Sequence, residues 1–129
     1  MENALLLLNT STGSFLIDIN TIVRIEASSN YSKIYFSPAM GGRTMLLTAK
    51  VLKWFEERLP QEGFTRLHRS HLVNNYFLQF NQNTCSAFEL KTGKIIQVSR
   101  RRRKQVLTKF LLPQQVLALP KPVLLPPAC

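Results

Sequence analysis

Five consecutive cationic residues, Arg100-Arg101-Arg102-Arg103-Lys104, are the part of this 129-residue chain whose types and spacing most clearly indicate a chemistry. They follow Val98-Ser99, the end of a strand-like segment and a serine that can cap a helix. Like charges repel one another, and the N-terminus of the helix that they would open already carries positive partial charge. A cationic run that is present despite both unfavourable electrostatic effects is typical of an anion site. We therefore expect the run to bind nucleic-acid phosphate or a guanine edge.

A second donor-rich segment, Arg66-Leu67-His68-Arg69-Ser70-His71-Leu72-Val73-Asn74, interrupts an otherwise apolar stretch. The planar guanidinium of Arg69 can bind a guanine edge or a phosphate, and it lies in the basic half of the chain. We therefore predict a functional role for Arg69. For His71 we favour the role of a satisfied interior histidine.

The sequence offers little for catalysis or for metal binding. His68 and His71 lie three residues apart without a third candidate ligand, and Ser70 lacks the glycine-bounded elbow of a nucleophilic serine. Glu56 and Glu57 are adjacent on the outer side of a predicted helix, so their carboxylates do not converge. The chain also has no phosphate-binding glycine loop. We expect neither an enzyme nor a bound cofactor or metal ion.

The net charge of +10 lies entirely in the second half of the chain. Residues 1–63 contain six basic and six acidic side chains, whereas residues 64–129 contain eleven basic side chains and a single acid, Glu89. A merely soluble basic protein would spread its charge, so this asymmetry indicates a face that binds a polyanion. By itself it does not separate DNA from RNA or from an anionic membrane.

The N-terminal residues do not have the pattern of a signal peptide, because an acid stands at position 2 and the apolar run is only four leucines long. No apolar run reaches the roughly 18 residues that a membrane span needs. We therefore expect a cytoplasmic protein without a membrane span.

Most of the chain has the period-two alternation and turn spacing of short β-strands. Strands are predicted at Leu5–Leu8, Phe15–Ile17, Ile22–Ala27, Tyr31–Phe36, Arg43–Leu47, Phe64–Leu67, Leu72–Val73, Tyr76–Phe80, Ser86–Leu90 and Ile95–Val98. Two helices are predicted, one capped by Thr48 over residues 49–59 and one capped by Ser99 over residues 99–112. We expect one mostly β domain over residues 1–112 and an extended or disordered proline-rich tail over residues 113–129.

Several ordered motifs together resemble the LytTR DNA-binding domain, the output module of bacterial response regulators of the LytR and AgrA type. These are Phe64-x-Arg66-x-His68-Arg69-Ser70-x-Leu72-Val73-Asn74 and, downstream, Val98-Ser99-Arg100-Arg101. Upstream, Ile25-Glu26-Ala27-Ser28-Ser29-Asn30-Tyr31-Ser32-Lys33 is similar to the family's E-x-x-x-N-Y segment, and the predicted helix ending at Leu59-Pro60 also matches. The resemblance covers roughly residues 3 to 110.

The resemblance implies a mostly β fold of about ten short strands in stacked sheets, with loops instead of a recognition helix in successive major grooves. Some members have a histidine where this chain has Ser32, so Lys33 or Asn30 is an alternative contact there. The base-contacting candidates are Arg69, Arg100, Asn30, Ser32 and Lys33, and the phosphate-contacting candidates are Arg101, Arg102, Arg103, Lys104 and His68.

The resemblance also implies a partner, double-stranded DNA with paired direct repeats, bound by a monomer or a weak dimer that pairs on DNA. Members commonly carry an N-terminal receiver domain. Only a few residues precede the first predicted strand, so we expect a stand-alone module, or a fragment of a longer protein. Its control would then come from abundance or from a separate regulatory protein.

Two other functions share the charge asymmetry. A basic RNA-binding or ribosome-associated module would want exposed aromatic side chains on a sheet for stacking on bases, and Tyr31 and Tyr35 are candidates. A structural protein would use the cationic run only to solvate a helix end, and its interactions would show no steep salt dependence.

Overall fold

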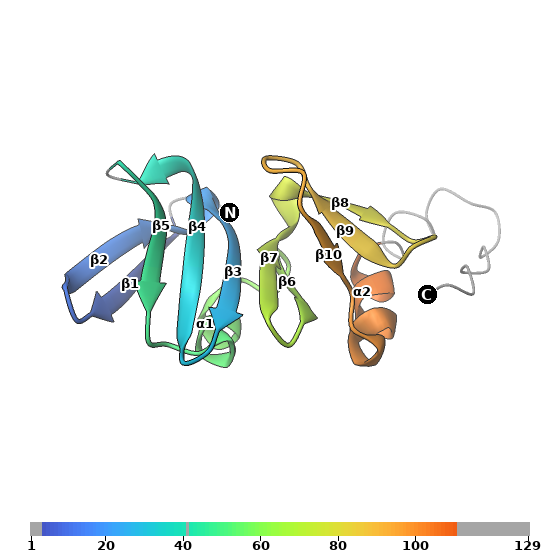
Figure 1. The fold of residues 1–129 in the computed structure, drawn as a ribbon, viewed down its shortest axis with the longest axis horizontal. Coiled ribbons are helices and arrows are strands. Elements are labelled where there is room, and N and C mark those ends of the chain that lie inside the picture. Colours follow the sequence, from blue (N-terminus) through green and yellow to red (C-terminus); the bar gives the residue numbers. More distant parts are fainter. Residues whose placement is uncertain (1–3, 41, 111–129) are drawn as a thin grey trace.

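The computed structural model of the chain describes residues 4–40 and 42–110 (Figure 1). The predicted tail, residues 113–129, and the last two residues of the predicted helix 99–112 lie outside the described residues.

Ten strands and two short helices make up the described chain, which confirms the predicted mostly β fold. The strands are β1 (Leu5–Thr10), β2 (Gly13–Asp18), β3 (Ile22–Ser28), β4 (Tyr31–Met40), β5 (Arg43–Thr48), β6 (Phe64–His68), β7 (His71–Asn74), β8 (Leu78–Asn81), β9 (Ser86–Glu89) and β10 (Ile95–Gln97). The helices are α1 (Leu52–Arg58) and α2 (Arg103–Phe110), and the 3₁₀ turns are η1 (Ile19–Thr21), η2 (Asn75–Phe77) and η3 (Arg100–Arg102).

The strands form three antiparallel sheets. β1 pairs with β2, the order of the five-stranded sheet is β5-β4-β3-β7-β6, and the order of the three-stranded sheet is β10-β9-β8. Figure 1 shows the five-stranded sheet between the β1–β2 hairpin on one side and the three-stranded sheet with α2 on the other.

The β6–β7 hairpin is shared by two hydrophobic cores. Phe64 and Leu72 pack with α1, the β1–β2 hairpin and the inner face of the five-stranded sheet. Leu67 and Val73 point the other way, into a second core with the three-stranded sheet and α2. Successive side chains of a strand face opposite sides, so a hairpin buried on both faces can join two cores. The β6–β7 turn consequently has a fixed position relative to both.

Helix α1 begins later than its sequence predicts. The predicted cap, Thr48, accepts a hydrogen bond from the amide of Lys50 at 3.2 Å and so closes a short turn before the helix. The helix itself begins at Leu52, after Val51, whose side chain makes no capping hydrogen bond. The predicted start at residue 49 is therefore wrong, because the threonine hydroxyl stabilises a turn instead of the helix end.

The second helix also differs from its prediction at its start. Ser99 makes no side-chain capping bond, and its backbone amide donates to the Leu67 carbonyl of β6 at 2.9 Å. Arg100–Arg102 form a 3₁₀ turn, and the α-helix begins at Arg103. None of the helices among residues 4–40 and 42–110 is long and apolar enough to cross a membrane.

Candidate nucleic-acid interface

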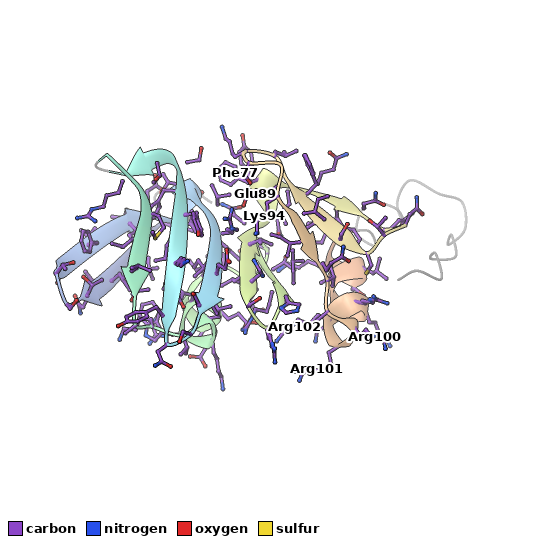
Figure 2. All side chains as sticks on the ribbon, viewed as in Figure 1. Phe77, Glu89, Lys94, Arg100, Arg101 and Arg102 are labelled. Atoms are coloured by element: carbon purple, nitrogen blue, oxygen red, sulfur yellow. The ribbon has the colours of Figure 1, made fainter. Side chains whose placement is uncertain are left out.

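Three segments that are far apart in the sequence lie along one edge of the molecule. They are the β3–β4 turn at Ser29-Asn30, the β6–β7 turn at Arg69-Ser70, and η3 at the start of α2 (Figure 1). Figure 2 shows Arg100, Arg101 and Arg102 at this same lower edge. All three predicted contact regions are thus brought to one side.

Backbone hydrogen bonds connect the three segments in series. The amide of Ala27, at the end of β3, donates to the Ser70 carbonyl of the β6–β7 turn at 2.8 Å. The amide of Ser99, directly before η3, donates to the Leu67 carbonyl of β6 at 2.9 Å. The spacing of the three segments is therefore set by backbone hydrogen bonds as well as by side-chain packing.

The β3–β4 turn is a tight two-residue connection in which Ser29 has a left-handed φ of 56°. Asn30 at its tip is exposed, and Lys33 further along β4 is half-buried beside Glu26 of β3. Ser32 differs from its predicted role. Its side chain is buried, and its hydroxyl donates to the Lys50 carbonyl at 2.6 Å. A direct base contact by Ser32 does not fit this geometry, and the residue instead anchors the turn to the segment before α1.

The β6–β7 turn presents Arg69 to solvent and is held from beneath by Arg66. The Arg66 guanidinium donates to the carbonyl of His68 at 2.8 Å and to the carbonyl of Arg69 at 2.7 Å. A third bond, to Glu56 Oε1 at 2.5 Å, fixes the guanidinium on α1. Arg66 thus fills the acceptors of the turn and leaves the Arg69 side chain to project outward.

A histidine–serine network lies on the other side of the same turn. Ser70 Oγ is 2.9 Å from the Nδ1 atoms of both His68 and His71, and the amide of Ser70 donates to His68 Nδ1 at 3.2 Å. A nitrogen that accepts from an amide carries no proton, so the predicted phosphate contact of His68 can come only from its Nε2 atom.

His71 provides a pH-dependent contribution to stability. Burial lowers its pKa below the usual 6.5, opposed by the Glu26 carboxylate and assisted by the charges of Lys94, Arg24 and His68. The unfolded chain therefore binds more protons than the folded chain as the pH falls below about 6.5. We expect acidification through this range to lower the free energy of unfolding, and to lower it less in His71→Gln. Urea unfolding between pH 8 and pH 5 measures both. A difference between the two proteins that does not vary with pH would contradict this assignment.

The five residues of the cationic run differ in their exposure to solvent. Arg100, Arg101 and Lys104 are exposed, whereas Arg102 and Arg103 are half-buried. The Arg102 side chain is only 21% exposed, and its Nη1 atom lies 4.0 Å from Glu56 Oε2. Burial lowers the pKa of this guanidinium, with a further contribution from neighbouring Arg66. Three of the five cations are therefore exposed and two are half-buried, and of these two Arg102 lies beside Glu56.

Comparisons with known proteins decide the family. The family model for the LytTr DNA-binding domain matches residues 12–110. The chain belongs to the LytTR DNA-binding domain family.

A solved structure agrees with this membership at the level of the fold. It is described as the LytTr DNA-binding domain of a methyl-accepting/DNA response regulator from Bacillus cereus. The two chains are 18% identical, with a TM-score of 0.66, and the match covers 85% of this chain and 99% of that one. No curated protein gives a significant match.

In this LytTR domain, sequence reasoning missed two cations close to the turns. Lys50 and Lys53 line a shallow depression of about 210 Å³ together with Asn30 and Arg69. The sequence indicated only that both lysines lie on the outer side of a helix. A signal would have been their place just after β5, but nothing local shows that the helix start lies beside the β3–β4 turn. Among the residues that the structure describes, no group of three or more His, Cys, Asp or Glu side chains could hold a metal ion.

Proposed function

We propose that this LytTR domain is a sequence-specific regulator of transcription that places its three turns in successive major grooves of double-stranded DNA. The observation that carries the proposal is the position of Asn30, Arg69 and Arg100, which are exposed and lie on three segments along one edge. Because backbone hydrogen bonds fix the spacing of these segments, they can act as a rigid set.

We assign base and phosphate contacts to the candidate residues according to how exposed their side chains are. Arg69 and Arg100 are proposed to contact guanine edges, with Asn30 as a third base contact. Arg101 and Lys104 are exposed and suit phosphates, while Arg102, Arg103, Lys33 and His68 have less of their surface available. Lys50 and Lys53 extend the phosphate-contacting surface toward α1.

We further propose that the target contains paired direct repeats, each bound by one copy, either as independent monomers or as a weak dimer that forms on DNA. A separate regulatory protein would supply control.

In vitro selection from random duplex DNA tests the proposed function. We expect recovery of a motif present as two direct repeats about one helical turn, or about 10 base pairs, apart. Binding to the selected duplex is then competed with single-stranded RNA of the same length. Recovery of no motif, together with equal competition by RNA, would favour the RNA-binding alternative.

Lys104→Ala tests a phosphate contact. We expect affinity to fall for selected and random duplexes alike. The slope of log affinity against log salt concentration should become less negative by about 0.9, the contribution of one phosphate contact. Fluorescence anisotropy at several salt concentrations measures both quantities. Lys91→Ala is the matched control, because Lys91 is an exposed lysine in the β9–β10 turn at the opposite end of the sheet (Figure 1). An unchanged slope in Lys104→Ala would remove Lys104 from the interface.

A further inference from the structure

Glu56 is an acidic side chain surrounded by the cations of the candidate interface. It lies on α1 and lines a groove of about 410 Å³ between α1 and α2, together with Lys53, Arg66, Arg102 and Lys109. A carboxylate in this position weakens the attraction of the surface for a polyanion. Its contacts show what it contributes instead.

The first contact leads to the β6–β7 turn. Glu56 Oε1 accepts from Arg66 Nη1 at 2.5 Å, and the other two nitrogens of that guanidinium donate to the carbonyls of His68 and Arg69. Arg66 has a side chain that is only 14% exposed, so the ion pair is shielded from salt more than a surface pair is. Glu56 therefore fixes the guanidinium that shapes the turn carrying Arg69.

The second contact leads to η3. Glu56 Oε2 lies 4.0 Å from Arg102 Nη1, and Arg102 is two residues from Arg100. One carboxylate thus attracts a guanidinium from each of the two segments that carry the proposed base-contacting arginines. The two segments also share the Ser99–Leu67 backbone bond, but that bond does not orient any side chain.

We propose that Glu56 is a positioning residue for DNA recognition, one that holds the β6–β7 turn and η3 in the relative orientation that sequence-specific binding needs. The inference rests on the proposed function. It predicts opposite effects on two affinities: loss of the carboxylate removes a repulsive charge, which favours random DNA, but loosens the two segments, which disfavours the specific site.

The experiment compares Glu56→Ala with Glu56→Gln. Both remove the same charge, but glutamine keeps the chain length and one acceptor oxygen for Arg66. We expect the ratio of specific to random-duplex affinity to fall about tenfold in Glu56→Ala and by less in Glu56→Gln, with random-duplex affinity unchanged or raised in both. Alanine is a good helix former, so α1 should persist, and thermal unfolding of each variant checks this.

Glu57→Ala is the control for charge alone. Glu57 is the next residue on α1 and is exposed, and within the described part of the chain its only ion pair is with Arg58, at 3.8 Å. Its removal should leave the affinity ratio unchanged. A double-mutant cycle of Glu56→Ala with Arg66→Ala tests the route, because losses that act through Arg66 should not add.

The outcomes separate this inference from the proposed function. If the unmodified domain selects no DNA motif, the proposed function fails. If it selects a motif but Glu56→Ala leaves the ratio of specific to random-duplex affinity unchanged, as Glu57→Ala should, only the positioning role is overturned. Simple additivity in the cycle with Arg66→Ala would likewise overturn it.

Discussion

Glu89→Ala is expected to lower the free energy of unfolding by about 3–5 kcal/mol, the usual cost of leaving a buried partner charge unpaired. Glu89 is fully buried, and its two carboxylate oxygens accept from Arg24 Nη1 at 2.6 and 2.7 Å. Arg24 is itself 7% exposed and lies over the Tyr35 ring at 3.9 Å. Without Glu89 its charge keeps only the more distant carboxylate of Glu26, at 3.5 Å. Because the total free energy of unfolding of a domain of this size is only about 5–15 kcal/mol, the loss is severe.

Urea unfolding of Glu89→Ala measures this effect against Glu57→Ala. The control removes an exposed glutamate and should change stability by less than about 0.5 kcal/mol. A third protein, Arg24→Met combined with Glu89→Leu, replaces the pair by apolar side chains of similar volume. We expect it to recover most of the loss, because no unpaired charge remains buried. A cost below 1 kcal/mol for Glu89→Ala would show that Arg24 finds another partner or water.

The same pair also joins two sheets. Arg24 belongs to β3 of the five-stranded sheet, and Glu89 ends β9 of the three-stranded sheet. The pair lies near the edge opposite the cationic run, as the labelled Glu89 and Arg100 show in Figure 2. The pair therefore helps to fix the position of the five-stranded sheet, whose β3–β4 turn carries Asn30, relative to the three-stranded sheet and the second core.

Arg69→Ala and Arg100→Ala are each expected to lower affinity for the selected duplex by about 1–3 kcal/mol and to relax base preference at one position of each repeat. Both side chains are exposed, and neither forms a side-chain ion pair with another of the described residues, so their removal should lower the stability of the fold little. Anisotropy titrations against duplexes substituted at single positions would assign each arginine to its base pair.

Arg103→Ala is the comparison for these two variants. It should weaken binding to all duplexes roughly equally, because a phosphate contact carries no base information. If Arg100→Ala lowered specific and random affinity by the same factor, Arg100 would be a phosphate contact only, and Arg69 would remain as the candidate base contact of the two.

Most strands were predictable because they depend on local alternation, but the predicted strand start at Tyr76 is wrong, since Asn75–Phe77 form the 3₁₀ turn η2 and β8 begins at Leu78. In β4, period two placed Ser32 with Ile34 and Phe36, and all three are buried. That pattern argued against a base contact by Ser32, which came from its position in the family motif alone. The periodicity was the better guide here, because it reports directly on which face of the strand meets the core.

The helix starts were not predictable from their capping residues. Thr48 and Ser99 are both good N-caps by type, yet one closes a turn with the amide of Lys50 and the other makes no side-chain cap. Ser99 stays bound to Leu67 of β6 through its amide, a contact 32 positions away that no local pattern contains.

The sequence by itself determined that this protein is mostly β and that its positive charge is concentrated in one half, and it led to the prediction that Arg69 and the run from Arg100 bind an anion. These features depend on side-chain type and short-range spacing. Only the tertiary structure decided which of the cations are available. Long-range contacts bury Arg24 against Glu89 and hold Arg66 and Arg102 at Glu56, while Arg69, Arg100 and Arg101 remain exposed on one edge.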